Sequence, residues 1–117
     1  MERYNKSVQI TDTIKVGGDR TVLFGGPCAA ESYHICFETG FHVKALCQQL
    51  GIDYVFKSSF DKANRTSESS YRGPTMEGGL DILARIKKDL QVPIVTDVHE
   101  SYQCAEVATV VDVLQIP

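Results

Sequence analysis

Asp53-Tyr-Val-Phe-Lys57 is the stretch that decides the fold, because this short apolar and aromatic run is bounded by a glycine before it and serines after it. Three other runs have the same apolar, β-branched character: Thr21–Phe24, Pro93–Asp97 and Val111–Ile116. Strands that are covered on both faces of a parallel sheet have this composition. The sequence therefore predicts four strands.

Amphipathic segments separate these strands. Ser32 is expected to cap a helix that runs to about Leu50, with Gly51 as a left-handed stop. A second apolar stripe recurs at helical spacing and consists of Met76, Leu80, Leu83, Ile86 and Leu90. A shorter helix is expected from about Tyr102 to Ala108, with Ser101 as its cap. The alternation of strands and helices predicts a parallel sheet with right-handed crossovers.

Composition narrows the class of protein. The 117 residues are 43% hydrophobic and 23% charged, which fits one globular domain over residues 1–117. The formal charge of −3 provides no cationic field for nucleic acid or anionic lipid. No apolar run approaches the roughly 18 residues of a spanning helix, and Met1–Asn5 is too polar for a secretory signal. We expect a cytoplasmic protein with no membrane or nucleic-acid partner.

The two ends of the chain frame the domain differently. Residues 1–20 contain two alternating runs around Thr11-Asp12, which predict a hairpin at the bottom of the sheet. Residues 21–117 contain the β/α units and stop at Ile116-Pro117, directly after a strand. A (β/α)₈ barrel takes about 250 residues. We therefore expect a TIM barrel of which this chain supplies the first four strands, truncated at its C-terminus; a small flavodoxin-like sheet is the alternative.

Polar residues occupy the ends of three predicted strands. Alternation along each strand places Lys57, Asp97 and Gln115 above an apolar residue on one face. Reactive groups of parallel α/β folds lie at these carboxyl ends. A cation, a carboxylate and an amide that converge there predict a polar site. The alternative is that they face solvent or a helix.

The segment from Ser58 to Thr75 is too long for a simple turn, and it is rich in anion-binding side chains. Lys62 and Arg65 supply positive charge and forked donors, while Asn64 and Thr66 supply short neutral donors. This combination predicts phosphate binding. A solvated polar loop is the alternative reading.

The cysteine spacing fits neither a zinc ribbon nor a redox pair, so a reducing compartment is expected. Cys36 and Cys47 share the stripe of the first helix and are predicted core residues, as is Cys104. Cys28 follows a proline at a strand end, where a thiolate is a candidate ligand for zinc or ferrous iron. A small buried residue is the alternative for Cys28.

The three histidines are less informative. We expect His34 and His42 on the surface or rim of the first helix, and His99 in a supporting position near Asp97. Their roles stay open.

Five blocks of sequence, in this order, closely resemble the 3-deoxy-D-manno-octulosonate 8-phosphate synthase family, in its N-terminal half. They are Gly26-Pro-Cys-Ala-Ala-Glu-Ser32, Phe56-Lys-Ser-Ser-Phe-Asp-Lys-Ala-Asn-Arg65, Ser70-Tyr-Arg-Gly-Pro74, Thr96-Asp-Val-His-Glu100 and Leu114-Gln-Ile-Pro117. The resemblance implies a homotetrameric TIM-barrel transferase that condenses phosphoenolpyruvate with D-arabinose 5-phosphate and water. The product of that family leads to lipopolysaccharide.

The resemblance also implies roles for individual residues. Lys57, Ser59, Lys62 and Gln115 look like phosphoenolpyruvate contacts, and the two lysines with Asp97 look catalytic. The arabinose phosphate clamp looks like Asn64, Arg65 and Thr66. The cysteine at position 28 resembles that of the metal-requiring members of the family, which hold a divalent metal. Further metal ligands are therefore expected beyond residue 117.

Three other readings remain open. The related aromatic-pathway synthase, which uses erythrose 4-phosphate, typically reads Lys-Pro-Arg-Thr where this chain reads Lys62-Ala-Asn-Arg65. A non-catalytic phosphate-binding α/β module would explain the loop cations but not the strand-end residues. An isolated 117-residue fragment of the synthase would be catalytically inert, because the rest of the pocket would be missing.

Overall fold

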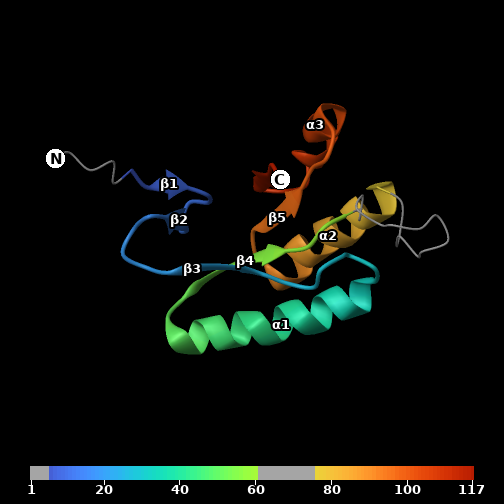
Figure 1. The fold of residues 1–117 in the computed structure, drawn as a ribbon. Coiled ribbons are helices and arrows are strands. Elements are labelled where there is room, and N and C mark those ends of the chain that lie inside the picture. Colours follow the sequence, from blue (N-terminus) through green and yellow to red (C-terminus); the bar gives the residue numbers. More distant parts are fainter. Residues whose placement is uncertain (1–5, 61–75) are drawn as a thin grey trace.

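The computed structural model describes residues 6–60 and 76–117 and shows a four-stranded parallel sheet with helices between its strands (Figure 1). In order across the sheet, the strands are β3 (Val22–Gly25), β4 (Asp53–Lys57), β5 (Ile94–Asp97) and β6 (Val113–Gln115). Each strand is hydrogen-bonded to the next one along the chain. The predicted parallel α/β sheet is confirmed.

Helix α1 (Tyr33–Leu50) begins and ends at the residues that the sequence indicates. The Ser32 hydroxyl accepts a hydrogen bond from the backbone N–H of Ile35 at 3.1 Å, which satisfies one free donor of the first turn. Gly51 adopts a left-handed conformation with φ of 68°, and its N–H bonds back to the last turn.

Helix α2 (Met76–Leu90) packs against α1 through the predicted stripe, of which Leu80, Leu83, Ile86 and Leu90 are buried. Gly40 allows this approach, because a Cβ there would lie 2.6 Å from Leu90 Cδ1 and 3.1 Å from Phe56 Cδ2. At the N-terminal end of α1, Tyr33 also links the two helices. Its hydroxyl donates to the Asp89 carboxylate, and its ring lies 4.0 Å from the Arg85 guanidinium carbon. No helix within the described ranges is long and apolar enough to cross a bilayer.

The two faces of the sheet have different surroundings. Tyr54, Phe56 and Ile94 are buried in one apolar cluster with the helices. Val55 and Val95 are also buried, at 0% and 1% exposure, yet lie outside that cluster. Side chains alternate along a strand, so these valines belong to the opposite face. Lys57 and Asp97 lie two residues further along and share it.

The segment after β5 corrects one prediction. In place of a single helix from 102 to 108 capped by Ser101, a 3₁₀ turn, η1 (Ser101–Gln103), leads into the short helix α3 (Cys104–Val107). The Gln103 side-chain oxygen accepts from the backbone N–H groups of His99 and Glu100 at 2.9 and 3.1 Å. Glu100 is therefore the N-terminal cap of the turn, and Ser101 is its first residue.

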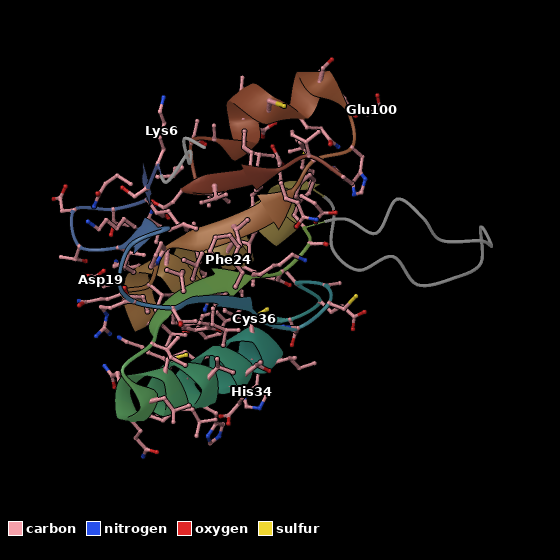
Figure 2. All side chains as sticks on the ribbon, turned by 60° about the vertical axis from the view of Figure 1, so that its left-hand side comes forward. Lys6, Asp19, Phe24, His34, Cys36 and Glu100 are labelled. Atoms are coloured by element: carbon pink, nitrogen blue, oxygen red, sulfur yellow. The ribbon has the colours of Figure 1, made fainter. Side chains whose placement is uncertain are left out.

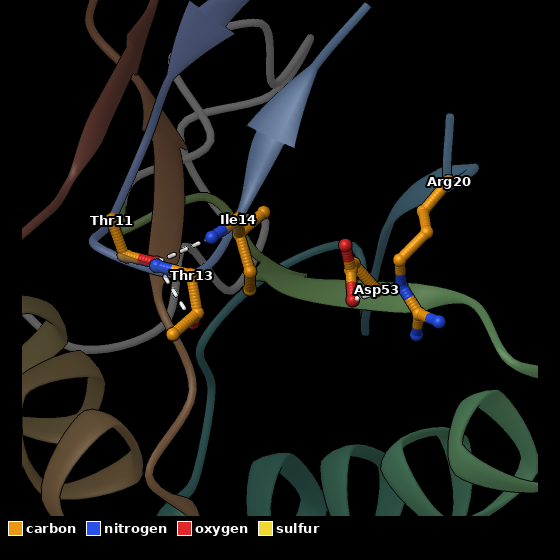
Figure 3. A network of polar contacts seen from close by, with 5 residues as sticks. All are labelled: Thr11, Thr13, Ile14, Arg20 and Asp53. Atoms are coloured by element: carbon orange, nitrogen blue, oxygen red, sulfur yellow. Dashed lines mark hydrogen bonds and ion pairs between the residues drawn. The ribbon is translucent and has the colours of Figure 1, made fainter. Parts of the chain in front are cut away.

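The predicted N-terminal hairpin is present as β1 (Val8–Gln9) and β2 (Lys15–Val16), paired antiparallel. The Thr11 hydroxyl organises the connection by accepting from the backbone N–H of Thr13 at 3.3 Å and of Ile14 at 3.1 Å (Figure 3).

The hairpin lies at the amino ends of the sheet strands (Figure 1). Ile14 lines a hollow with Pro93 and Asp112, which precede β5 and β6. Close by, the Arg20 guanidinium pairs with Asp53 at 3.0 Å, at the start of β4 (Figure 3). The carboxyl ends of the strands, where a site is expected, are therefore at the other edge.

Candidate active site

The polar residues at the carboxyl edge lie on one face of the sheet, but at different positions along the strand direction. Asp97 pairs in register with Gln115, whereas Lys57 pairs with Val95, two residues before Asp97. A strand rises about 3.3 Å per residue, so Lys57 lies roughly 6–7 Å below Asp97 along the strand direction. Lys57 is half-buried and Gln115 is exposed. The structure thus brings Asp97 and Gln115 level and places Lys57 deeper.

Asp97 is held by two partners. One carboxylate oxygen accepts a hydrogen bond from the Ser59 hydroxyl at 2.5 Å, and the other lies 3.0 Å from His99 Nε2. The Asp97 side chain is 14% exposed, and a carboxylate so enclosed needs such partners. An aspartate joined to a histidine can hold or move a proton at a bound oxygen. Among the described residues, this trio forms one connected polar cluster at the carboxyl ends of the strands.

The turn that carries Cys28 is fixed against β4 by its backbone. A Cβ on Gly26 would lie 2.1 Å from the Lys57 carbonyl oxygen, so only glycine permits this approach. The Tyr54 hydroxyl donates to the Gly25 carbonyl at 2.8 Å, and the Ser59 N–H donates to the Cys28 carbonyl at 3.2 Å. Cys28 itself is an exposed free thiol at the mouth of the strands.

The other cysteines behave as core residues. Cys36 lies between α1 and the sheet (Figure 2), and burial, with a smaller effect of the Glu31 charge, raises the pKa of its thiol to about 11. Burial also raises the pKa of Cys47, and Cys104 is partly buried against the same cluster. The raised pKa values keep the Cys36 and Cys47 thiols protonated near neutral pH, so these two are poor ligands.

Two histidines lie away from the site, as expected. His34 is on the outer side of α1 (Figure 2), and His42 is also exposed, with its Nε2 3.8 Å from Glu38.

Comparison with known proteins identifies the family of this chain. The sequence profile described as DAHP synthetase I family matches residues 5–117. The chain belongs to this family. A 2-dehydro-3-deoxyphosphooctonate aldolase of Cyanothece sp. is 51% identical over 111 residues, covering 94% of this chain and 41% of that protein. Proteins of the same name from Fusobacterium nucleatum and Shewanella frigidimarina are each 50% identical, covering 94% and 96% of this chain.

The resemblance drawn from the motifs to the 3-deoxy-D-manno-octulosonate 8-phosphate synthases is thereby confirmed. This DAHP synthetase I family chain spans about 40% of the length of those relatives.

The described residues of this chain do not form a complete metal site. A protein metal centre needs at least three ligands. Among residues 6–60 and 76–117, no three His, Cys, Asp or Glu side chains are grouped to hold an ion. Cys28 is accessible to an ion, but it is a single donor, so the described residues do not by themselves fit a metal.

Four of the predicted substrate contacts cannot be placed. The polar loop residues Lys62, Asn64, Arg65 and Thr66 lie outside the described residues, so the phosphate clamp stays a prediction.

Sequence reasoning missed two residues at this edge. Ser58 and Thr96 are buried hydroxyls that bond across the strand ends, at 2.8 Å to Pro27 O and 2.6 Å to Ser58 O respectively. Hydroxyls within an apolar strand were the available signal. His99 is not among them: it was expected near Asp97, and its Nε2 lies 3.0 Å from that carboxylate.

Proposed function

We propose that the full-length protein carrying this chain condenses phosphoenolpyruvate with D-arabinose 5-phosphate and water to give 3-deoxy-D-manno-octulosonate 8-phosphate and phosphate, for lipopolysaccharide biosynthesis. The observation that carries the proposal is the Ser59, Asp97 and His99 cluster at the carboxyl edge of a parallel sheet in this family. Relatives named 2-dehydro-3-deoxyphosphooctonate aldolase support the substrate class. The sheet is proposed to be the first half of a TIM barrel in a cytoplasmic homotetramer.

Each residue has a proposed role in this reaction. Lys57 and Lys62 offset the charges of phosphoenolpyruvate, Gln115 donates to it, and Ser59 contacts it. A bond forms between the enol carbon and the aldehyde carbon, water supplies the new oxygen, and the phosphate leaves with its bridging oxygen. Asp97 lies beside the aldehyde oxygen, which gains a proton as it becomes a hydroxyl. His99 supports that carboxylate through the 3.0 Å contact.

Two further roles are proposed, one for loop residues outside the described ranges and one for Cys28. Asn64, Arg65 and Thr66 are proposed to clamp the phosphate of the sugar. Cys28 is proposed as one ligand of a divalent zinc or iron ion, with the other ligands expected beyond residue 117 of the full-length protein. When bound, such an ion supplies Lewis acidity.

The test is phosphate release from phosphoenolpyruvate by the full-length protein, with and without D-arabinose 5-phosphate. Release that requires the five-carbon sugar supports the proposal, and a chelator should abolish it. Release with erythrose 4-phosphate instead would assign the aromatic-pathway reaction. Binding of phosphoenolpyruvate without release under any condition would favour a non-catalytic phosphate-binding module.

Arg65→Ala separates the two substrates. It should weaken D-arabinose 5-phosphate binding far more than phosphoenolpyruvate binding, because only the sugar phosphate is assigned to it. Comparable losses for both substrates would contradict the clamp.

A further inference from the structure

A chain of buried hydroxyls crosses the strand ends beneath the site. Thr96, which is fully buried, donates from Oγ1 to the Ser58 carbonyl at 2.6 Å. Ser58, 1% exposed, donates from its own hydroxyl to the Pro27 carbonyl at 2.8 Å. Pro27 directly precedes Cys28. The chain therefore runs from the last residues of β5 to the turn that follows β3.

These bonds lie where the regular ladder stops. Strand β3 ends at Gly25 and β4 at Lys57, and pairing resumes only at the single bridge between Ala29 and Ser59. In the interval, the Ser59 N–H is already used by the Cys28 carbonyl. The Ser58 hydroxyl supplies the half-buried Pro27 carbonyl with a donor from the neighbouring segment, and the loss of a partner there is costly.

This chain of hydroxyls lies next to residues that have a role in the proposed function. Ser58 adjoins Ser59, whose hydroxyl holds Asp97, and its acceptor Pro27 adjoins Cys28. A shift of this turn therefore moves a thiol and a serine together. None of the roles proposed above uses Ser58 or Thr96, and neither side chain is accessible to a ligand.

We infer that Ser58 and Thr96 are positioning residues that hold the turn over residues 25–29 at a fixed height against β4 and β5. Ser58 acts on the turn directly, and Thr96 acts through the Ser58 carbonyl. Their importance for catalysis rests on the proposed function, but the placement of the turn can be measured without any substrate.

The experiment is amide hydrogen exchange in Ser58→Ala, Thr96→Val and Thr96→Ser. Ala30 N–H, which bonds to the Ser59 carbonyl at 2.8 Å, reports on the turn. Val98 N–H, which bonds to the Gln115 carbonyl at 3.1 Å, reports on the same sheet edge away from it. Loss of one bond should speed exchange at Ala30 about 3- to 10-fold, with little change at Val98. Thr96→Ser keeps the hydroxyl and should restore slow exchange.

Thr109→Val is the matched control. Thr109 Oγ1 also donates to a backbone carbonyl at 2.6 Å, that of Glu106, but on the exposed end of α3. It should leave Ala30 exchange unchanged. Equal acceleration at Ala30 and Val98 in Ser58→Ala and Thr96→Val would mean general destabilisation and would overturn the inference. So would unchanged exchange at Ala30. Either result leaves the phosphate-release test intact, so the two proposals fail separately.

Discussion

Ser59 and Asp97 share a 2.5 Å hydrogen bond although they are 38 positions apart in the chain. The separation equals the register of β4 on β5, in which Phe56 pairs with Ile94. Regular pairing thus delivers a hydroxyl to a carboxylate just beyond the last ladder residues. The contact fixes the Asp97 side chain from one side while His99 fixes it from the other.

Because Ser59 is also a proposed contact of phosphoenolpyruvate, removal of its hydroxyl should weaken the binding of that substrate. In the full-length protein, Ser59→Ala should raise the KM for phosphoenolpyruvate about 10- to 100-fold, since a hydrogen bond to a charged group contributes about 1.5–3 kcal/mol. Steady-state kinetics measures this. Ser101→Ala, which removes an exposed hydroxyl in η1, is the control and should leave KM unchanged. Equal KM values in all three proteins would remove Ser59 from the site.

Gly26→Ala should be strongly destabilising, because its Cβ would lie 2.1 Å from backbone, at Lys57 O. We expect a loss of about 3 kcal/mol or more in the free energy of unfolding, within the range of severe backbone effects. Urea unfolding followed by circular dichroism gives the value. Gly25→Ala is the matched control, because the nearest contact of its Cβ is an ordinary 3.8 Å to Leu23 Cγ. Similar losses for both would show that the turn can shift to make room.

Asp112 and Lys87 should differ in their contribution to stability although they are paired at 3.1 Å. Asp112 also accepts the N–H of buried Ile94 at 2.9 Å, so Asp112→Ala leaves that donor unmet and should cost about 1–3 kcal/mol. The Lys87 side chain is 43% exposed, and Lys87→Ala should cost about 0.2–1 kcal/mol. Urea unfolding of both variants measures the two losses, because a lower midpoint at an unchanged m value means a lower free energy of unfolding. A larger loss for the lysine variant would contradict this ranking.

The Cys36 thiol should make stability depend on pH in alkaline solution. Its pKa rises from 9.0 to about 11 on folding, so the folded state keeps a proton that the unfolded state releases. The corresponding stability is complete below pH 9 and is lost as the pH rises through about 11. Unfolding free energies measured from pH 8 to 11 should fall more steeply in the wild type than in Cys36→Ala. Parallel curves for wild type and Cys36→Ala would refute the assignment.

Much of the fold could be predicted because its signals are local. The strand Asp53–Lys57 and the helix Tyr33–Leu50 have the predicted bounds, since the hydrophobic pattern lies within each element and a serine cap and a glycine stop directly flank the helix. The turn at Glu100 could not be predicted in this way. It depends on a long side chain, Gln103, that reaches back to two backbone groups and competes with the simpler serine cap.

The site was less predictable because it depends on register. Period-two alternation places Lys57 and Asp97 on one face, but only the pairing of β4 with β5 shows that Ser59, and not Lys57, is level with Asp97. Gly40 is a similar case. From the sequence alone, a glycine in the middle of a helix only weakens that helix. The structure explains the glycine, because a Cβ at this position would meet Leu90 and Phe56 from other elements.

The hydrogen bond from Tyr33 to Asp89 has a spectroscopic consequence. The chain contains no tryptophan, so its intrinsic emission comes from its five tyrosines. A carboxylate that accepts a hydrogen bond from a phenol quenches the excited ring, and this one also raises the pKa of Tyr33. Separation of α1 from α2 should therefore brighten the fluorescence, so that the docking of these two helices can be followed in real time without an added dye.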